Sequence, residues 1–153
     1  MASQDDFPSY FRQIQVKFSR LYAHVLQKTN LTLPQYALLN ELAAQGSIPM
    51  TEISEKLHIT KPAVTHLVDQ LEKKKLLKRI AHASDRRISL LKVETKGKKM
   101  VRCIQATILR FLLSTLDQFN AKEKAVITRF YGRLSQTVDE ILKKFEEAPS
   151  CKK

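Results

Sequence analysis

Glycine and cysteine are scarce in this chain, and each shortage excludes a class of functional site. Only three glycines occur in 153 residues, at positions 46, 97 and 132, and they cannot form a glycine-rich phosphate loop. The two cysteines, Cys103 and Cys151, lie far apart without the spacing of metal ligands. We expect them to be reduced thiols in a cytoplasm.

Long apolar runs and a secretion signal are also missing. No segment approaches the roughly eighteen consecutive apolar residues that a membrane helix requires. The first residues, Met-Ala-Ser-Gln-Asp-Asp, are polar and acidic, unlike a secretory signal. We therefore expect a cytoplasmic protein with no membrane partner.

Residues for catalysis or metal binding do not cluster in the sequence. The four histidines are scattered, and the serine, histidine and acidic residues form no nucleophile motif. We expect no enzyme, no catalytic residue, no metal site and no cofactor. The sequence by itself identifies no ligand-binding residue.

The strongest pattern lies between residues 50 and 73. Apolar residues recur three and four positions apart in 53–57 and again in 64–71, which indicates two short amphipathic helices. Only a tight turn fits between them, and Thr60 is expected to cap the second helix. Two helices joined by so short a turn form a helix-turn-helix.

After this pair of helices the pattern becomes that of strands. Residues 77–81 and 88–93 are short and rich in branched aliphatic side chains, and a polar, charged stretch separates them. This pattern predicts a two-stranded ribbon with a charged tip, and residues 48–50 are expected to add a short third strand. We therefore expect a mainly α fold with a small β-wing, a winged helix-turn-helix.

The second helix of the motif presents a mixed polar face once its apolar stripe is buried. Such a face offers cations for phosphates and hydrogen-bonding groups for base edges, although an ordinary solvated face would look similar. Pro62 is compatible with the first helical turn, which has no amide bond to lose. The residues of this helix expected to contact DNA are Thr60, Lys61, Pro62, Thr65, His66, Gln70 and Lys73.

Positive charge is concentrated around this helix and the ribbon. Residues 60–99 contain 12 Lys or Arg and 4 acidic residues, so they hold a net charge of +8 out of +12 for the whole chain. A polyanion-binding surface is the expected cause. A membrane surface would also attract this charge, but the apolar stripe of the helix is already used in a small core.

Long amphipathic segments flank the winged helix on both sides. Apolar residues recur at helical spacing in 7–27, 95–116 and 120–145, and their faces are too wide for one small domain to cover. A second copy would bury them and would place two recognition helices about a two-fold axis. We expect a homodimer on an imperfect palindrome, although the aromatic stripe of 7–27 could instead line a ligand pocket.

Three segments carry a resemblance to a known family. They are Thr60-Lys-Pro-Ala-Val-Thr-His-Leu-Val-Asp-Gln-Leu-Glu-Lys-Lys, Leu76-Leu77-Lys78-Arg79 and Ala83-Ser84-Asp85-Arg86-Arg87. They resemble the MarR family of winged-helix transcription regulators, and most of all its SlyA-type members. The specific part is Asp-Arg-Arg about a dozen residues after Val-Asp-Gln-Leu-Glu. The resemblance extends over nearly the whole chain.

The resemblance implies roles for individual residues. In such regulators the second helix enters the major groove, so Pro62, Thr65 and His66 would face bases and Lys61 a phosphate. In the wing of such regulators, an aspartate orients a neighbouring arginine, and the arginine at the tip enters the minor groove. Asp85 would be this aspartate, although it could instead cap the hairpin turn. The wing residues assigned to DNA in this way are Arg79, Ser84, Asp85, Arg86 and Arg87.

Two positions depart from the family pattern. His66 stands where arginine is common, so its grip on DNA is expected to be weaker. Lys75 occupies a helix-ending position where glycine is usual. We expect either a left-handed lysine or a different exit from the helix.

The sequence thus predicts a homodimeric, sequence-specific regulator that binds double-stranded DNA, with repression as the expected effect. The setting is a prokaryotic cytoplasm, with association to the nucleoid. The resemblance also implies that a small aromatic or phenolic effector binds between the reading head and the dimer helices. The alternatives are an architectural, weakly specific DNA-binding protein, a module for an acidic protein partner, and a regulator that senses oxidants through Cys103.

Four segments make up the predicted organisation. Residues 1–30 form an N-terminal dimerisation helix and 31–94 the winged helix-turn-helix domain. Residues 95–146 form C-terminal dimerisation helices, and 147–153 a disordered tail.

Overall fold

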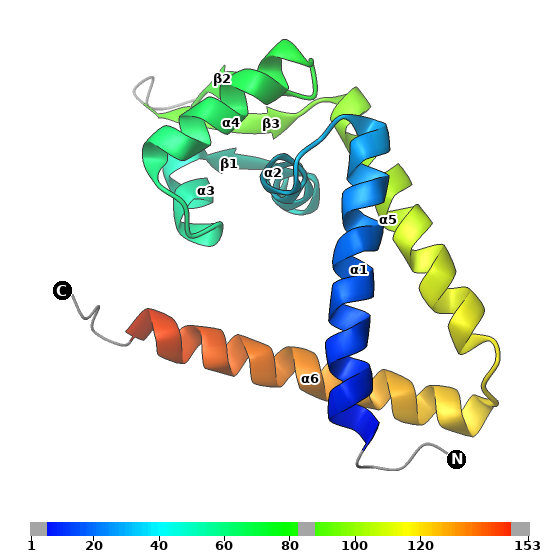
Figure 1. Cartoon of the computed structure of the whole chain (residues 1–153). Coiled ribbons are helices and arrows are strands. Elements are labelled where there is room, and N and C mark those ends of the chain that lie inside the picture. The colour runs from blue at the N-terminus through cyan, green and yellow to red at the C-terminus, as the bar shows by residue number, and fades with distance from the viewer. Residues whose placement is uncertain (1–5, 83–87, 148–153) are drawn as a thin grey trace. The chain divides into compact units, whose positions relative to one another are not determined.

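The computed structural model describes residues 6–82 and 88–147 (Figure 1). Six helices and three strands alternate along these residues in the order expected for a winged helix. They are α1 (Phe7–Thr29), α2 (Leu33–Gln45), β1 (Ser47–Pro49), α3 (Met50–Lys56), α4 (Lys61–Lys73), β2 (Leu77–Ala81), β3 (Ser89–Val93), α5 (Thr95–Leu116) and α6 (Ala121–Glu147).

The chain forms two compact units, Met1–Leu109 and Arg110–Lys153. The first unit contains α1 to β3 and most of α5, and the second contains the end of α5 and all of α6. The division predicted from the sequence, with functional boundaries after residues 30, 94 and 146, stays a prediction. Its proposed tail, 147–153, lies outside the described residues except for Glu147.

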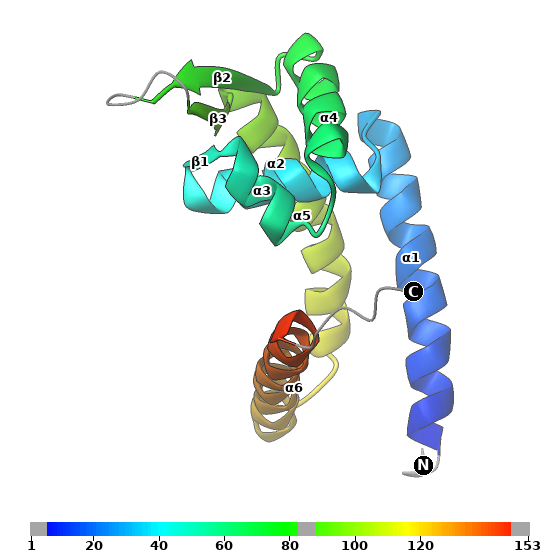
Figure 2. The ribbon, with the colours of Figure 1, turned by 90° about the vertical axis from the view of Figure 1, so that its left-hand side faces the viewer.

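The first unit contains a three-stranded antiparallel sheet in the order β1-β3-β2. Leu77 pairs with Val93 and Ile48 pairs with Leu91, so both outer strands hydrogen-bond to β3. The helix α3 packs on β1 and β3, and α4 packs on β2 (Figure 2). The ribbon predicted from the sequence is confirmed, with Ile88 just outside β3. The third strand predicted at 48–50 is found one residue earlier, at Ser47–Pro49, because Met50 already starts α3.

One hydrophobic core holds the first unit together. The apolar stripe of α4 supplies Val64, Val68 and Leu71, all with no exposed surface, while Leu67 is only partly buried. Completely buried side chains of α2, α3 and β3 meet this stripe: Leu38, Leu39, Leu42, Ile53 and Leu91. The packing leaves the opposite face of α4 toward solvent.

Helix starts follow the capping residues of the sequence. The hydroxyl of Thr32 accepts from the Gln35 amide, and the Gln35 side chain accepts from the Thr32 amide, which completes a capping box on α2. Thr60 caps α4 by accepting from the amide of Ala63 at 3.4 Å. The last helix starts with the same reciprocal arrangement between Asn120 and Glu123.

Three helix ends have a left-handed residue that is not glycine. Asn30, His58 and Lys75 have φ angles of 55°, 50° and 58°. In each case the next amide bonds to the carbonyl five residues earlier, as in a Schellman motif. These bonds are Leu31 to Leu26 at 3.2 Å, Ile59 to Ser54 at 3.1 Å and Leu76 to Leu71 at 3.0 Å.

Thr95 is the first residue of α5. The residue before it, Glu94, accepts the first hydrogen bond of the helix, from the amide of Lys98 at 2.9 Å. The close approach at Gly97 explains why glycine is needed there. A Cβ at this position would lie 2.2 Å from the carbonyl oxygen of Leu76. Any side chain would therefore push α5 away from the end of α4.

The second unit contains an amphipathic α6 without any buried residue among those described. Its apolar side chains recur at helical spacing and are exposed in the single chain: Phe130 (45% exposed), Leu134 (38%), Val138 (44%), Ile141 (44%) and Phe145 (73%). An exposed apolar stripe of this length normally marks an interaction surface.

The left-handed lysine gives the first prediction. We expect Lys75→Gly to raise the free energy of unfolding by about 0.5 to 1 kcal/mol, because relief of the Cβ clash outweighs the extra freedom of an unfolded glycine. Urea denaturation at one protein concentration measures the change. The control Lys73→Gly, at the last residue of α4, replaces a lysine whose backbone is right-handed and helical, and should lower stability. Equal losses for both variants would contradict this account of the turn.

Candidate nucleic-acid interface

The exposed face of α4 contains the residues that the sequence assigned to the major groove. Lys61, Pro62, Thr65, His66 and Lys73 are exposed on this helix. The Thr65 hydroxyl donates to the Lys61 carbonyl at 3.1 Å, so it remains free to accept. The face combines two cations with several hydrogen-bonding groups and no exposed bulky apolar side chain.

Gln70 differs from the other assigned residues because it is half-buried and has partners inside the protein. Its Oε1 accepts from Nε2 of Gln35 on α2 at 2.7 Å. Its Nε2 lies 2.7 Å from Nε2 of His66, one turn earlier on α4. The structure therefore connects the reading face to α2 through a pair of amide side chains.

Arg79 on β2 is held by the acidic residues of α4. Its guanidinium donates to Asp69 and to Glu72, and its backbone amide donates to Glu72 Oε1 at 3.2 Å. The hydrogen bond to Asp69 is the largest cause of a raised pKa for Arg79, which keeps the side chain charged. The arrangement fastens the first wing strand to the reading helix.

The tip of the wing lies outside the described residues. Ser84, Asp85, Arg86 and Arg87, which the resemblance assigned to DNA contact by the wing, all fall there and stay predictions. The strands that lead to the tip are closed by a bond from the amide of His82 to the carbonyl of Ile88 at 3.1 Å. Lys78 on β2 pairs with Glu94 at 2.8 Å.

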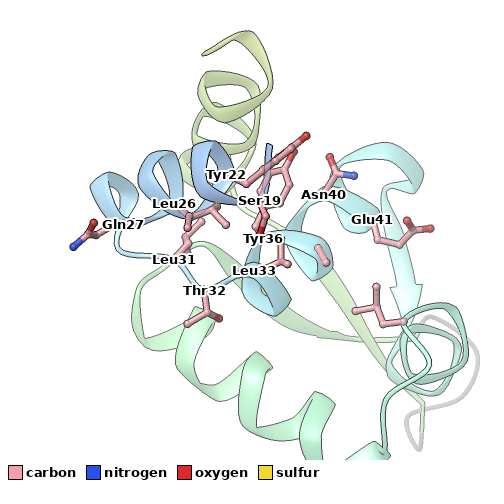
Figure 3. Close-up of a pocket in the computed structure, with 13 residues that line it drawn as sticks. Ser19, Tyr22, Leu26, Gln27, Leu31, Thr32, Leu33, Tyr36, Asn40 and Glu41 are labelled. Atoms are coloured by element: carbon pink, nitrogen blue, oxygen red, sulfur yellow. The ribbon is translucent and has the colours of Figure 1, made fainter. Parts of the chain in front are cut away.

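A pocket of about 910 Å³ lies between α1 and α2 (Figure 3). Tyr22 and Tyr36 meet there with ring centroids 6.4 Å apart, and Leu26, Leu31 and Leu33 add apolar surface. Burial raises the pKa of Tyr36, with a further contribution from Tyr22, so its phenol stays protonated at neutral pH. Two tyrosine hydroxyls in an apolar lining suit a small aromatic molecule.

The part of the chain that the structure describes offers neither a metal site nor a membrane-spanning helix. No group of three or more His, Cys, Asp and Glu residues there could hold a metal ion. None of its helices is both long and apolar enough to cross a membrane. Cys103 is exposed on α5.

Sequence reasoning missed two long-range contacts. Arg79 was assigned to DNA, but its partners Asp69 and Glu72 become neighbours only when β2 folds back on α4. Gln35 was given no role from the sequence, although it is only 4% exposed and bonds to Gln70 on α4. Neither partner is visible from spacing along the chain.

Comparison with known proteins agrees with this geometry. The pattern of the MarR family matches residues 31–89, which contain α2 to the start of β3. The transcriptional repressor MdtR of Bacillus subtilis is 28% identical over 144 residues, covering 90% of this chain and 93% of the relative. The uncharacterised regulator YhbI of the same organism is 21% identical over 128 residues, covering 84% and 83%.

These matches support a MarR-family winged-helix regulator. Solved structures share its fold. A MarR family protein from Bacillus stearothermophilus has a TM-score of 0.77 at 23% identity, covering 88% of this chain and 94% of that one. A point mutant of Staphylococcus aureus MepR, bound to an oligodeoxyribonucleotide, has a TM-score of 0.68 at 23% identity, covering 86% and 97%.

The family match over residues 31–89 and the regulator relatives support a DNA-binding transcription regulator rather than an enzyme. The winged helix-turn-helix predicted from the sequence is confirmed. The individual DNA-contacting residues stay predictions, and among them Arg79 and Gln70 have side-chain partners on other elements of the fold.

The second prediction concerns Arg79. We expect Arg79→Met to lower the free energy of unfolding by about 0.5 to 1 kcal/mol, a range suited to partly exposed ion pairs. Addition of Glu72→Gln should then cost little more, because the pair is already broken. Lys78→Met, which breaks only the exposed pair with Glu94, is the control. Lower DNA affinity with unchanged stability would assign Arg79 to DNA contact instead.

Proposed function

We propose that this MarR-family chain acts as a homodimeric repressor that binds a pseudo-palindromic DNA site and responds to a small aromatic or phenolic molecule. The observation that carries the proposal is the exposed face of α4, with Lys61, Thr65 and His66 on a helix whose other face is completely buried. A rigid helix with such a face is suited to the major groove.

In this proposal, contacts to phosphates give the protein its affinity for DNA, and α4 gives it selectivity for the DNA sequence. Lys61 and Lys73 lie at the two ends of the exposed face, where they can reach the phosphates on either side of a groove. The wing arginines Arg86 and Arg87 are proposed to enter the minor groove beside it. A bound dimer would then block or rearrange access of polymerase to a promoter.

The third prediction tests DNA recognition by selection from random duplexes. We expect a palindromic site whose half-sites are about one helical turn apart. Lys61→Ala should weaken binding to all sequences and reduce the salt dependence by about one phosphate contact per subunit. Lys143→Ala on α6 removes the same charge elsewhere and should change neither. Recovery of no motif would favour the architectural alternative.

Homodimerisation is proposed from the uncovered apolar stripes. On α1 the exposed residues include Phe7, Tyr10, Phe11 and Ile14, and α6 has its own stripe from Phe130 to Phe145. Surfaces of this size and character are rare on monomers. A second copy of the chain would cover the same stripes on both subunits at once.

The fourth prediction is a change of oligomeric state. We expect Leu134→Asp, on the apolar stripe of α6, to convert the dimer into a monomer and to weaken operator binding at least tenfold, because the two heads lose their linkage. Gln136→Asp places the same charge on the opposite face of α6 and should leave both properties unchanged. Sedimentation at micromolar concentration measures the state. A wild-type monomer would refute this part of the proposal.

The effector site is proposed to be the pocket between α1 and α2. Thr32 lines this pocket, and its amide donates at 3.1 Å to the Gln35 oxygen, while Gln35 in turn bonds to Gln70 on α4. A molecule that shifts Thr32 would therefore act on the reading helix. A preference of about 1 to 3 kcal/mol for one position of α4 is enough to change DNA binding.

The fifth prediction tests that site. We expect Ala37→Phe, which fills the pocket, to keep DNA affinity but to abolish any change in affinity caused by phenol or benzoate, the probes used. Ala44→Phe adds the same ring at an exposed position of α2 outside the pocket and should keep the response. If neither probe alters DNA binding or melting of the wild-type protein, this site has no such role.

Two further parts of the proposal concern setting and oxidants. We place the protein in a prokaryotic cytoplasm, in association with the nucleoid, because its proposed target is DNA. Oxidant sensing through the exposed Cys103 is the alternative mode of regulation. Loss of DNA binding in peroxide that Cys103→Ser prevents would favour it over the aromatic effector.

A further inference from the structure

We infer that Gln35, on α2, determines which ring nitrogen of His66 carries the proton. His66 then donates a hydrogen bond to DNA and selects base edges that accept one. The inference rests on the proposed function, since it names what the α4 face selects. It follows from a series of hydrogen bonds that joins four side chains and one backbone amide, all within residues 30–74.

The chain of bonds begins at two groups that can only donate. The backbone amide of Thr32 and the ammonium of Lys74 both point at Oε1 of Gln35, at 3.1 and 3.2 Å. Lys74 is itself held by the carbonyl of Asn30 at 2.6 Å. Because neither an amide N–H nor an ammonium can accept, the Gln35 atom that faces them must be its oxygen.

The orientation of Gln35 determines that of Gln70. Gln35 is only 4% exposed, so no solvent-exposed orientation is available to its amide. With its oxygen toward Lys74, its Nε2 faces Gln70 and donates to Oε1 at 2.7 Å. A reversed Gln70 would bring two donors together in a buried site, which costs about 1 to 3 kcal/mol.

The orientation of Gln70 determines that of His66. Since Oε1 of Gln70 is used by Gln35, its Nε2 faces the ring of His66 at 2.7 Å. An amide nitrogen only donates, so Nε2 of His66 must accept. In the neutral imidazole the proton is therefore on Nδ1.

His66 thus presents a hydrogen-bond donor, its Nδ1–H, on the exposed face of α4. It is exposed on the α4 face beside Thr65 and Pro62, and its remaining ring nitrogen carries N–H. In the major groove this group matches N7 or O6 of guanine, N7 of adenine and O4 of thymine, whereas the exocyclic amine of cytosine offers only another donor. Gln70 is a positioning residue in this scheme, because its two polar ends already have protein partners.

A direct test is the tautomer of His66 in the free protein. Nitrogen-15 NMR of the full chain at about pH 8, where histidine is neutral, distinguishes a proton on Nδ1 from one on Nε2. We expect the Nδ1–H form for His66. The Nε2–H form in the wild-type protein would overturn the inference without any use of DNA.

Gln35→Glu should exchange donor and acceptor in the hydrogen bond between Gln70 and His66. A carboxylate accepts at both oxygens, so it can keep Lys74 and Thr32 while accepting from Gln70, which must then turn its oxygen toward His66. The expected result is the Nε2–H tautomer. Gln105→Glu is the matched control, because Gln105 makes a similar bond between helices to Asn40 at 2.7 Å that does not involve α4. An unchanged tautomer in a folded Gln35→Glu protein would refute the mechanism.

The DNA arm of the experiment reads out base preference. The operator position at which selection disappears in His66→Ala identifies the base that His66 contacts. There the wild type should favour guanine or thymine over cytosine by about fivefold, the worth of one hydrogen bond. Gln35→Glu should lose or reverse this preference, and Gln105→Glu should keep it. The same preference in both glutamate variants would overturn the inference.

The two arms separate the inference from the proposed function. If the wild-type protein selects no DNA sequence, the proposed function fails. The NMR result then decides by itself whether Gln35 determines the tautomer of His66. If it selects DNA but His66→Ala changes no position, the inferred role of His66 fails while the proposed function stands.

Discussion

Burial of one face of α4 is the constraint on which the rest of this structure depends. Val64, Val68 and Leu71 have no exposed surface, and removal of a leucine from such a position costs about 2 to 5 kcal/mol. The rotation of α4 about its axis is therefore fixed by the core. Every residue that the helix presents to solvent is determined by this packing, including the cations and His66.

The ends of α4 hold it in place along its axis. Thr60 starts the helix, a left-handed Lys75 ends it, and Gly97 lets α5 pass close to the carbonyl of Leu76, just after this turn. Side chains outside the helix add two more links, Arg79 from β2 and Gln35 from α2. The first link couples the wing to the reading helix, and the second couples it to the pocket between α1 and α2.

Much of this could be read from the sequence, because local physics determined it. Apolar spacing located the helices, Thr60 marked the start of α4, and branched residues marked the strands. The departure at Lys75 was predicted as one of two outcomes, and the left-handed lysine is the one found. What could not be read depends on tertiary contacts: the bond from Gln35 to Gln70, and the attachment of Arg79 to two acids on α4. Both join residues that no periodicity relates.

The most direct test of the central claim is where α4 lies on bound DNA. An iron chelate attached at Ala63→Cys, an exposed position of α4, cuts the nearest sugars when Cys103 and Cys151 are replaced by serine. The account predicts two clusters of cuts about one helical turn apart, each bordering a major groove. Uniform cutting, or no cutting while the protein stays bound, would contradict it.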